Sequence, residues 1–155
     1  MRNRYNVVGV DPGVSGGIAL VDPSGAISLH AMPDSLPGLY QLLTDIRYKD
    51  AQLWIEEIPK FTGRNIPGST VAVLFQNVGR IEGIALALGY SLHRVPPTTW
   101  QNPLGLGGKR SCASSAEWKR KLKTKAEELY PNVDGITLKT ADALLIAHHA
   151  MGGER

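Results

Sequence analysis

Three short apolar segments separated by turns open this chain, and they constrain its fold more than any other feature. The first runs from Tyr5 to Val10 and ends in Asp11-Pro12-Gly13, and the second runs from Gly17 to Val21. A turn signal at residues 22–25 leads into a third segment, from Ala26 to His30. Apolar and β-branched runs of this length, bounded by Pro, Gly and Asp, predict β-strands. Such short connections predict that the three strands form an antiparallel meander.

Helical and strand-like patterns alternate along the rest of the chain. Apolar residues spaced three and four apart predict helices, and short runs rich in apolar residues predict strands. The predicted elements are a helix at 36–46, a strand at 52–56, a loop at 57–67, a helix at 71–88, a strand at 90–95, and helices at 114–130 and 140–151. A meander joined to crossover strands predicts an α/β fold, with a five-stranded mixed sheet flanked by helices.

Two glycines lie four residues apart inside the predicted helix at 71–88. Gly79 and Gly83 lower helix stability in isolation, and glycines in this arrangement usually indicate close approach by another backbone. The approaching element could be the protein's own sheet or a second subunit. We favour an internal contact.

The composition fits one compact domain spanning residues 1–155. With 155 residues and 43% hydrophobic content, the chain can bury a core but is short for two ordinary domains. Its first residues lack the pattern of a signal peptide, and no stretch approaches the roughly 20 apolar residues that span a bilayer. The single cysteine, Cys112, excludes an internal disulfide and a thiolate zinc cage. We expect no membrane partner and a cytoplasmic location.

Most of the positive charge lies in one segment. The net charge is +3, and seven basic residues lie between Lys109 and Lys125, where Glu117 is the only acidic residue. This segment carries +6, which leaves −3 for the remainder of the chain. The asymmetry is typical of a polyanion-binding flank beside an acidic site, although a solvated helix face would give the same pattern.

Three acidic residues are flanked mainly by apolar neighbours. Asp11 and Glu56 each end a predicted strand, and Asp142 falls in the first turn of a helix rich in Ala and Leu. Carboxylates brought together repel one another and need cations, and their oxygens favour Mg²⁺ or Mn²⁺. Such ions activate water and neutralise a phosphate under attack. Each residue also has a structural explanation: an Asx turn for Asp11, a basic partner for Glu56, and the positive end of its helix for Asp142.

Four motifs around these residues resemble one protein family. They are Asp11-Pro12-Gly13 with Gly16-Gly17, Trp54-Ile55-Glu56, Pro97-Thr98-Thr99-Trp100-Gln101 with Gly105-Leu106 and Gly107-Gly108-Lys109, and Ala141 to His148. In this order and spacing they are similar to the RuvC family of Holliday junction resolvases, which implies a ribonuclease H-like fold. The third motif resembles the phage-type and plant organellar members in particular. This resemblance implies a cytoplasmic protein encoded by a bacterium or a phage, or a protein of an organelle matrix in a eukaryote.

The resemblance implies an endonuclease that binds a four-way DNA junction as a homodimer and nicks two opposing strands symmetrically, using two Mg²⁺ or Mn²⁺ ions. Asp11 would be shared by both metals, Glu56 would bind one, and Asp142 would bind the other. Glu57 is adjacent to Glu56, but strand alternation directs it to the opposite face. The family usually carries Asp or His three residues before the helix aspartate, where this chain has Lys139.

Lys139 leaves the second metal position open to several interpretations. A protonated lysine does not bind metal, so Lys139 could act at the scissile phosphate, leave the second metal weakly held, or mark an impaired enzyme. Asp134, in a nearby loop, could supply the missing carboxylate ligand. His148 and His149 are expected to be helix residues rather than ligands, because Asp142 lies more than one turn away.

Recognition of a junction is largely recognition of shape, so we expect lysine and arginine to contact phosphates. The expected DNA-binding residues are Lys60, Phe61, Arg64 and Asn65 in the loop after Glu56, and Lys109, Arg110, Lys119, Arg120 and Lys123 in the basic segment. Phe61 could insert at the junction centre or cap the core. Trp100 is expected to be packed.

Other functions fit parts of the same pattern. The three carboxylates would also serve another ribonuclease H-like nuclease, one that cuts flaps or processes RNA. A non-catalytic junction-binding protein is favoured by Lys139. A kinase of the actin-like fold also begins with Asp and glycines, but we expect this chain to be too short for its two-domain cleft.

Overall fold

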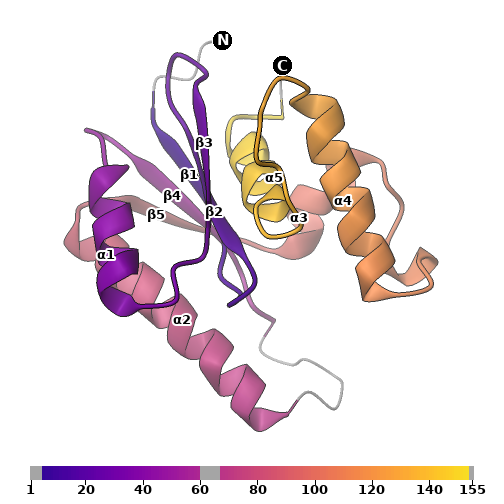
Figure 1. The fold of residues 1–155 in the computed structure, drawn as a ribbon, viewed down its shortest axis with the longest axis horizontal. Coiled ribbons are helices and arrows are strands. Elements are labelled where there is room, and N and C mark those ends of the chain that lie inside the picture. The colour runs from indigo at the N-terminus through magenta and orange to yellow at the C-terminus, as the bar shows by residue number, and fades with distance from the viewer. Residues whose placement is uncertain (1–4, 60–66, 154–155) are drawn as a thin grey trace.

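The computed structural model describes residues 5–59 and 67–153, and its centre is a five-stranded mixed sheet (Figure 1). The strand order across the sheet is β3-β2-β1-β4-β5. β2 pairs antiparallel with β1 and β3, whereas β4 pairs parallel with β1 and β5. The strands are β1 Val7–Asp11, β2 Gly17–Val21, β3 Ile27–Ala31, β4 Gln52–Glu56 and β5 Ser91–Val95. The predicted α/β fold with a five-stranded mixed sheet is confirmed.

Parallel pairing of β1 with β4 brings two acidic residues to the same edge of the sheet. Val10 lies opposite Ile55, so Asp11 and Glu56 follow at the carboxyl ends of neighbouring strands. Val10 and Ile55 pack in the hydrophobic cluster that also contains the buried residues of α1 (Leu36–Asp45) and α2 (Gly68–Ala87). Because side chains alternate along a strand, Asp11 and Glu56 face the other side of the sheet.

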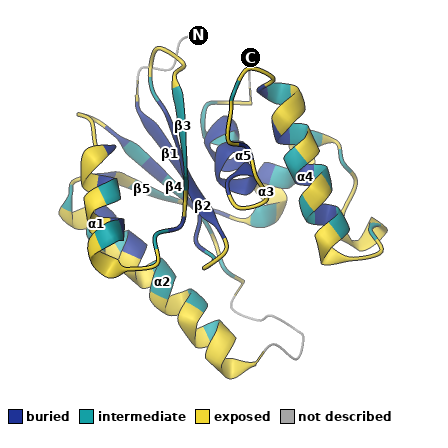
Figure 2. Cartoon of the chain, viewed as in Figure 1, coloured by how far each residue is buried: buried dark blue, intermediate teal, exposed yellow. Residues whose placement is uncertain are grey.

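That other side is covered by α5 (Ala141–Ala150), and α4 (Ser115–Leu129) lies over α5 (Figures 1 and 2). Every residue of α5 from Ala141 to His148 is buried. A helix that is buried on all sides must be apolar all round, so a carboxylate on it needs a specific partner. In the described residues, no helix combines the length and the apolar character needed to cross a membrane.

Gly9 allows α5 to lie directly against the middle of the sheet. A Cβ atom at this position would come within 2.1 Å of the Ala143 carbonyl oxygen and 2.7 Å of the Ala147 nitrogen. Both contacts are with helix backbone, which cannot move aside as a flexible side chain can. This close approach places the first turn of α5, and with it Asp142, beside the ends of β1 and β4.

A capping box formed by Ser114 and Glu117 fixes the start of α4. Ser114 Oγ accepts a hydrogen bond from the Glu117 backbone N–H at 3.1 Å, and Glu117 Oε2 accepts one from the Ala113 N–H at 2.8 Å. From this start, Trp118 and Leu122 fall on the buried side of the helix. Lys119 therefore lies at the edge of that buried side.

The sequence patterns do not predict α3 (Pro97–Gln101), a short helix directly after β5. Paired prolines indicate a break in a strand, but proline is also compatible with the first turn of a helix, where its missing N–H has no partner to lose. Two single 3₁₀ turns follow, at Asn102–Leu104 and Lys109–Ser111. α3 buries Trp100 almost completely, with 1% of its surface exposed.

The expected internal contact at Gly79 and Gly83 is wrong. A Cβ atom at either position would meet nothing within 4 Å. Both glycines lie on the outer side of α2, whereas Ile81 and Ala85 form its buried side. The contact with a second subunit, the other explanation for these glycines, stays a prediction.

Candidate functional site

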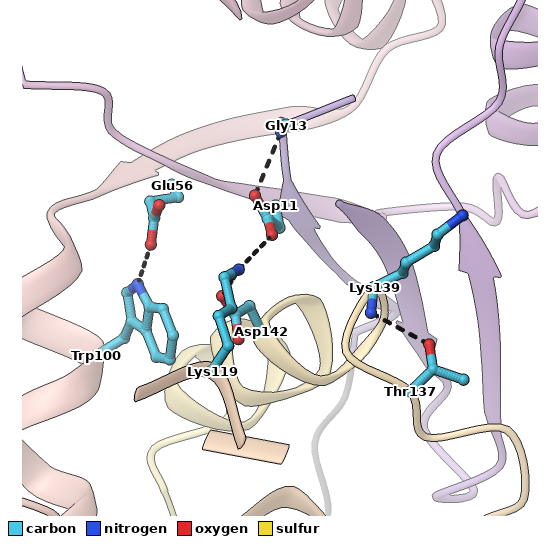
Figure 3. A network of polar contacts seen from close by, with 8 residues as sticks. All are labelled: Asp11, Gly13, Glu56, Trp100, Lys119, Thr137, Lys139 and Asp142. Atoms are coloured by element: carbon cyan, nitrogen blue, oxygen red, sulfur yellow. Dashed lines mark hydrogen bonds and ion pairs between the residues drawn. The ribbon is translucent and has the colours of Figure 1, made fainter. Parts of the chain in front are cut away.

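Asp11, Glu56 and Asp142 come from three elements that meet at one end of the sheet (Figure 3). Asp11 and Glu56 end two parallel strands, and Asp142 lies in the first turn of the helix that covers them. Asp11 and Asp142 are buried, and Glu56 is partly buried. The structure therefore brings together the three carboxylates predicted from sequence.

Lys119 on α4 extends its ammonium group between two of these carboxylates. Its Nζ donates to Asp142 Oδ2 at 2.5 Å and to Asp11 Oδ2 at 3.3 Å. The sequence analysis assigned Lys119 to DNA binding and did not predict this contact. A signal in the sequence is the tryptophan beside it, Trp118, which is buried in the structure.

The turn after β1 orients the Asp11 carboxylate. The Gly13 N–H donates to Asp11 Oδ1 at 3.2 Å, and the Gly16 N–H donates to the Gly13 carbonyl at 2.9 Å. A Cβ atom on Gly16 would lie 2.2 Å from the Asp11 carbonyl oxygen. The Asx turn proposed as a structural explanation for Asp11 is thus present, and it leaves Oδ2 directed at Lys119 (Figure 3).

Glu56 accepts a hydrogen bond from a buried indole rather than from a basic side chain. Trp100 Nε1 donates to Glu56 Oε2 at 2.9 Å. Trp100 is packed, as expected, but packing was the only role expected of it. The contact joins β4 to α3 across 44 positions of sequence, and it holds one oxygen of the carboxylate in a defined place.

The electrostatic environment keeps Glu56 protonated at pH values well above those at which a carboxyl group usually loses its proton. Burial, together with the charges of Asp11 and Asp142, raises the pKa of Glu56 from 4.5 to about 7. The Trp100 hydrogen bond and the charge of Lys119 act in the opposite direction. Glu56 therefore releases its proton near neutral pH, and an additional cation would favour its ionised form.

The pair formed by Lys119 and Asp142 shows the same competition between burial and charge. Burial raises the pKa of Asp142, and the nearby charge of Lys119 counteracts this effect. Burial alone would lower the pKa of Lys119, but Asp142 and Asp11 raise it above its usual value. We conclude that the ammonium group is charged and that the site concentrates negative charge beyond what one lysine neutralises.

The carboxylates of Asp11 and Asp142 fit a hard cation. Their Oδ2 atoms already converge on one positive charge, the ammonium of Lys119. Asp142 Oδ1 is buried and has no hydrogen-bond partner, so one further oxygen is available as a ligand. In the described part of the chain, however, no three acidic, histidine or cysteine side chains are grouped closely enough to bind one metal ion. The arrangement thus offers two carboxylates for a shared cation, with Glu56 close enough for its pKa to respond to their charge.

A groove of about 460 Å³ opens beside Asp11. Its basic lining residues are Lys119, Arg120 and Lys139. Lys139 is exposed at the turn before α5, and in Figure 3 its side chain extends away from the three carboxylates. It lies close enough to contribute charge to the groove, but it does not reach the carboxylates as a ligand would.

Two solved structures of RuvC from Thermus thermophilus are similar to this chain over nearly their whole length. One was solved in complex with a Holliday junction substrate; it has a TM-score of 0.65 at 15% sequence identity, over 96% of this chain and 94% of that chain. The other has a TM-score of 0.58 at 19% identity, over 96% and 97%. This chain has the fold of RuvC. No family model matches the sequence, and no curated protein matches it.

On the RuvC fold, the basic residues named in the sequence analysis have different surroundings. Arg120 is exposed in the groove beside Asp11. Lys109 and Arg110 are exposed in a 3₁₀ turn, and the charge of Lys109 acts on Asp142. Lys123, in contrast, forms an ion pair with Glu127 at 2.5 Å along α4, as a solvated helix face would.

Asp134, His148 and His149 lie away from the three carboxylates. Asp134 is exposed in the loop before α5 and does not line the groove, so the structure does not bring it to the site as the missing ligand. His148 and His149 lie in the last turn of α5, and His148 Nδ1 is 2.9 Å from the Tyr130 hydroxyl. The predicted DNA contacts in the loop after Glu56, namely Lys60, Phe61, Arg64 and Asn65, fall outside the described residues.

Proposed function

We propose that this protein is a structure-selective endonuclease that resolves four-way DNA junctions by paired symmetric nicks and uses Mg²⁺ or Mn²⁺. The observation that carries the proposal is the convergence of Asp11, Glu56 and Asp142 at one end of a RuvC fold. A structure with this fold was solved with a Holliday junction substrate. A groove beside Asp11, with Lys119, Arg120 and Lys139 among its lining residues, supplies positive charge that would attract a polyanion.

The three carboxylates would act as the ligands of divalent cations. Such cations supply an activated water and neutralise the charge that develops on the phosphate. Asp11 is the natural shared ligand, because it lies between Glu56 on the neighbouring strand and Asp142 on the covering helix. Glu56 must be ionised to bind a cation, and Trp100 orients its carboxylate by donating a hydrogen bond to Oε2.

The basic residues around the groove would hold the DNA backbone. Arg120 and Lys139 line the groove, and Lys109 and Arg110 are exposed in the segment that precedes α4. Contacts of this kind position a phosphate without reading sequence, and they weaken steeply with salt. We assign Lys123 a smaller role, because Glu127 already pairs with it.

Symmetric cutting of a junction requires two active sites, and we propose that a homodimer provides them. The outer side of α2 supports this proposal, since it exposes Phe75 and Leu86 together with Gly79 and Gly83. Exposed apolar side chains beside glycines with open space above them suit close packing by another helix. Sedimentation of the protein alone measures the subunit number.

The test is cleavage of a panel of labelled substrates with Mg²⁺ or Mn²⁺: a four-way junction, a flap, a duplex and an RNA:DNA hybrid. We expect the junction to be cut in two opposing strands and the other substrates to be cut slowly or not at all. Preferred cutting of a flap or of RNA would instead assign the protein to another branch of ribonuclease H-like nucleases. A gel-shift assay on the same substrates separates binding from cutting.

One observation favours a second candidate, a junction-binding protein that does not cut. Lys119 neutralises part of the acidic site, and the position three residues before Asp142 holds Lys139. Tight binding of the junction, with no cutting of any substrate across a range of metals and pH, would establish this alternative and exclude the enzyme.

A further inference from the structure

Lys119 occupies the position that a cation shared by Asp11 and Asp142 would need. Its Nζ contacts Oδ2 of both residues, at 3.3 Å and 2.5 Å. An ammonium group uses its protons to engage carboxylate lone pairs, and a metal ion needs those same lone pairs. The ammonium group and a divalent cation bound to the same oxygens would also repel each other, because both are positively charged. The ammonium and a divalent cation therefore compete for the same two oxygens.

The structure allows Lys119 to leave this position. Its side chain is 42% exposed, whereas those of Asp11 and Asp142 are 13% and 7% exposed. The carboxylates are held by the sheet edge and by α5, while the lysine reaches them from the surface helix α4. Movement of one flexible side chain is enough, since α4 and the core need not move.

We propose that Lys119 is the internal counter-ion of the metal-free site, and that a divalent cation displaces it on binding. The proposal rests on the metal-dependent function proposed above and concerns how that site is loaded. A displaced ammonium stays in the groove that Arg120 and Lys139 also line, where a DNA phosphate would lie. Loading of the metal then adds a positive charge to the DNA surface.

Direct competition predicts a measurable effect on metal affinity. When only a fraction of molecules has the site open, the apparent dissociation constant is raised by the reciprocal of that fraction. If the ion pair of Lys119 with Asp11 and Asp142 is broken in about one molecule in ten to one in a hundred, metal binding is weakened by roughly 10- to 100-fold.

The experiment is a titration of the metal-free protein with Mn²⁺ in the absence of DNA. Electron paramagnetic resonance measures the concentration of free Mn²⁺ at each step and so gives the amount bound. Lys119→Met removes the competing ammonium. Lys121→Met is the matched control, since Lys121 lies on the same helix and pairs with Glu117 at 3.8 Å rather than with the acidic site. We expect Lys119→Met to bind Mn²⁺ at least roughly tenfold more tightly than the native protein, and Lys121→Met to stay within about twofold.

A second measurement uses the native protein and does not depend on folding of the variant. Acetylation of lysine amines, read by mass spectrometry, should leave Lys119 protected in the metal-free protein and expose it when Mn²⁺ is added. The reactivity of Lys121 should not change. Unchanged protection of Lys119 at saturating Mn²⁺ would overturn the displacement.

The outcomes separate this inference from the proposed function. If the native protein and Lys119→Met bind Mn²⁺ equally well, the ammonium does not compete and only the inference fails. If neither protein binds Mn²⁺, the metal-dependent function itself fails. Binding by Lys119→Met but not by the native protein would mean that Lys119 blocks the site permanently, which also overturns displacement.

Discussion

Replacing Glu56 with Gln should make the metal-free protein more stable at neutral and alkaline pH. The substitution keeps a side-chain oxygen that can accept the hydrogen bond from Trp100, and it removes the charge that burial, Asp11 and Asp142 disfavour. Glutamine is also close to glutamate in size, so the packing around it is preserved. The expected change in stability is therefore electrostatic.

The magnitude follows from the pKa of Glu56, which is about 7 in the folded protein against 4.5 for an ordinary glutamate. Between these two pH values the folded protein holds a proton that the unfolded chain has released, so the free energy of unfolding falls as pH rises. The stabilisation is fully present below pH 4.5 and is lost above pH 7. At about 1.4 kcal/mol per tenfold change in acidity, the loss is about 1 to 3 kcal/mol, where the lower figure allows for solvent around a partly buried side chain.

The assay is urea unfolding of both proteins in EDTA, at intervals from pH 4.5 to 8.5. The difference in unfolding free energy, Glu56→Gln minus native, should grow by that amount across the range. Glu57→Gln is the matched control, because it removes an exposed carboxylate from the next position, and its pH-dependent difference should be smaller. A difference for Glu56→Gln that stays constant with pH would refute the electrostatic argument.

Three further substitutions and one control test separate parts of the structure. Lys139→Asp places a carboxylate beside the groove, and we expect cleavage to need roughly tenfold less Mn²⁺; an unchanged metal requirement would show that this position does not serve the site. Trp100→Phe keeps the ring but removes the donor to Glu56, so the pH dependence of cleavage should move to higher pH, and a profile that does not move would contradict the orienting role. Gly9→Ala forces a Cβ atom against the backbone of α5, so thermal unfolding should show a free energy of unfolding lower by about 3 kcal/mol. In the control Gly79→Ala, the added Cβ meets no neighbour, so the free energy of unfolding should be equal or slightly higher.

The sequence predicts the positions of the three carboxylates because simple periodicities govern them. Strand alternation and the parallel pairing of β1 with β4 are enough to place Asp11 and Glu56 at one edge and on one face. Asp142 follows from its location in the first turn of a helix that is apolar on all sides. These features do not depend on the detailed packing of one side chain against another.

The contacts made by Lys119 and Trp100 could not be predicted in this way. Lys119 reaches the carboxylates because of how α4 is rotated on α5, and this rotation depends on tertiary packing rather than on the pattern of charges. Trp100 reaches Glu56 from a helix that begins at Pro97, where the paired prolines indicate only a break. Charge patterns showed that the segment is basic, but not which lysine turns inward.

Gly79 shows the opposite error, in which a local signal was given a tertiary meaning that the structure does not support. A glycine inside a helix costs stability and so suggests that a neighbour requires it, but a side chain at Gly79 would meet nothing within 4 Å. The buried side of α2 is set by Ile81 and Ala85, and Gly79 lies on the other side. The helical spacing of those buried residues was the better guide.

The central claim is that Asp11 and its two neighbouring carboxylates form a metal-dependent site for cutting DNA junctions. Cleavage and binding of one synthetic four-way junction by the native protein and by Asp11→Asn test it most directly, with Mn²⁺ and with EDTA. The account predicts metal-dependent nicks at symmetric positions by the native protein, and for Asp11→Asn at least about a hundredfold less cutting with unchanged binding. Equal cutting by Asp11→Asn, or cutting by the native protein in EDTA, would contradict it.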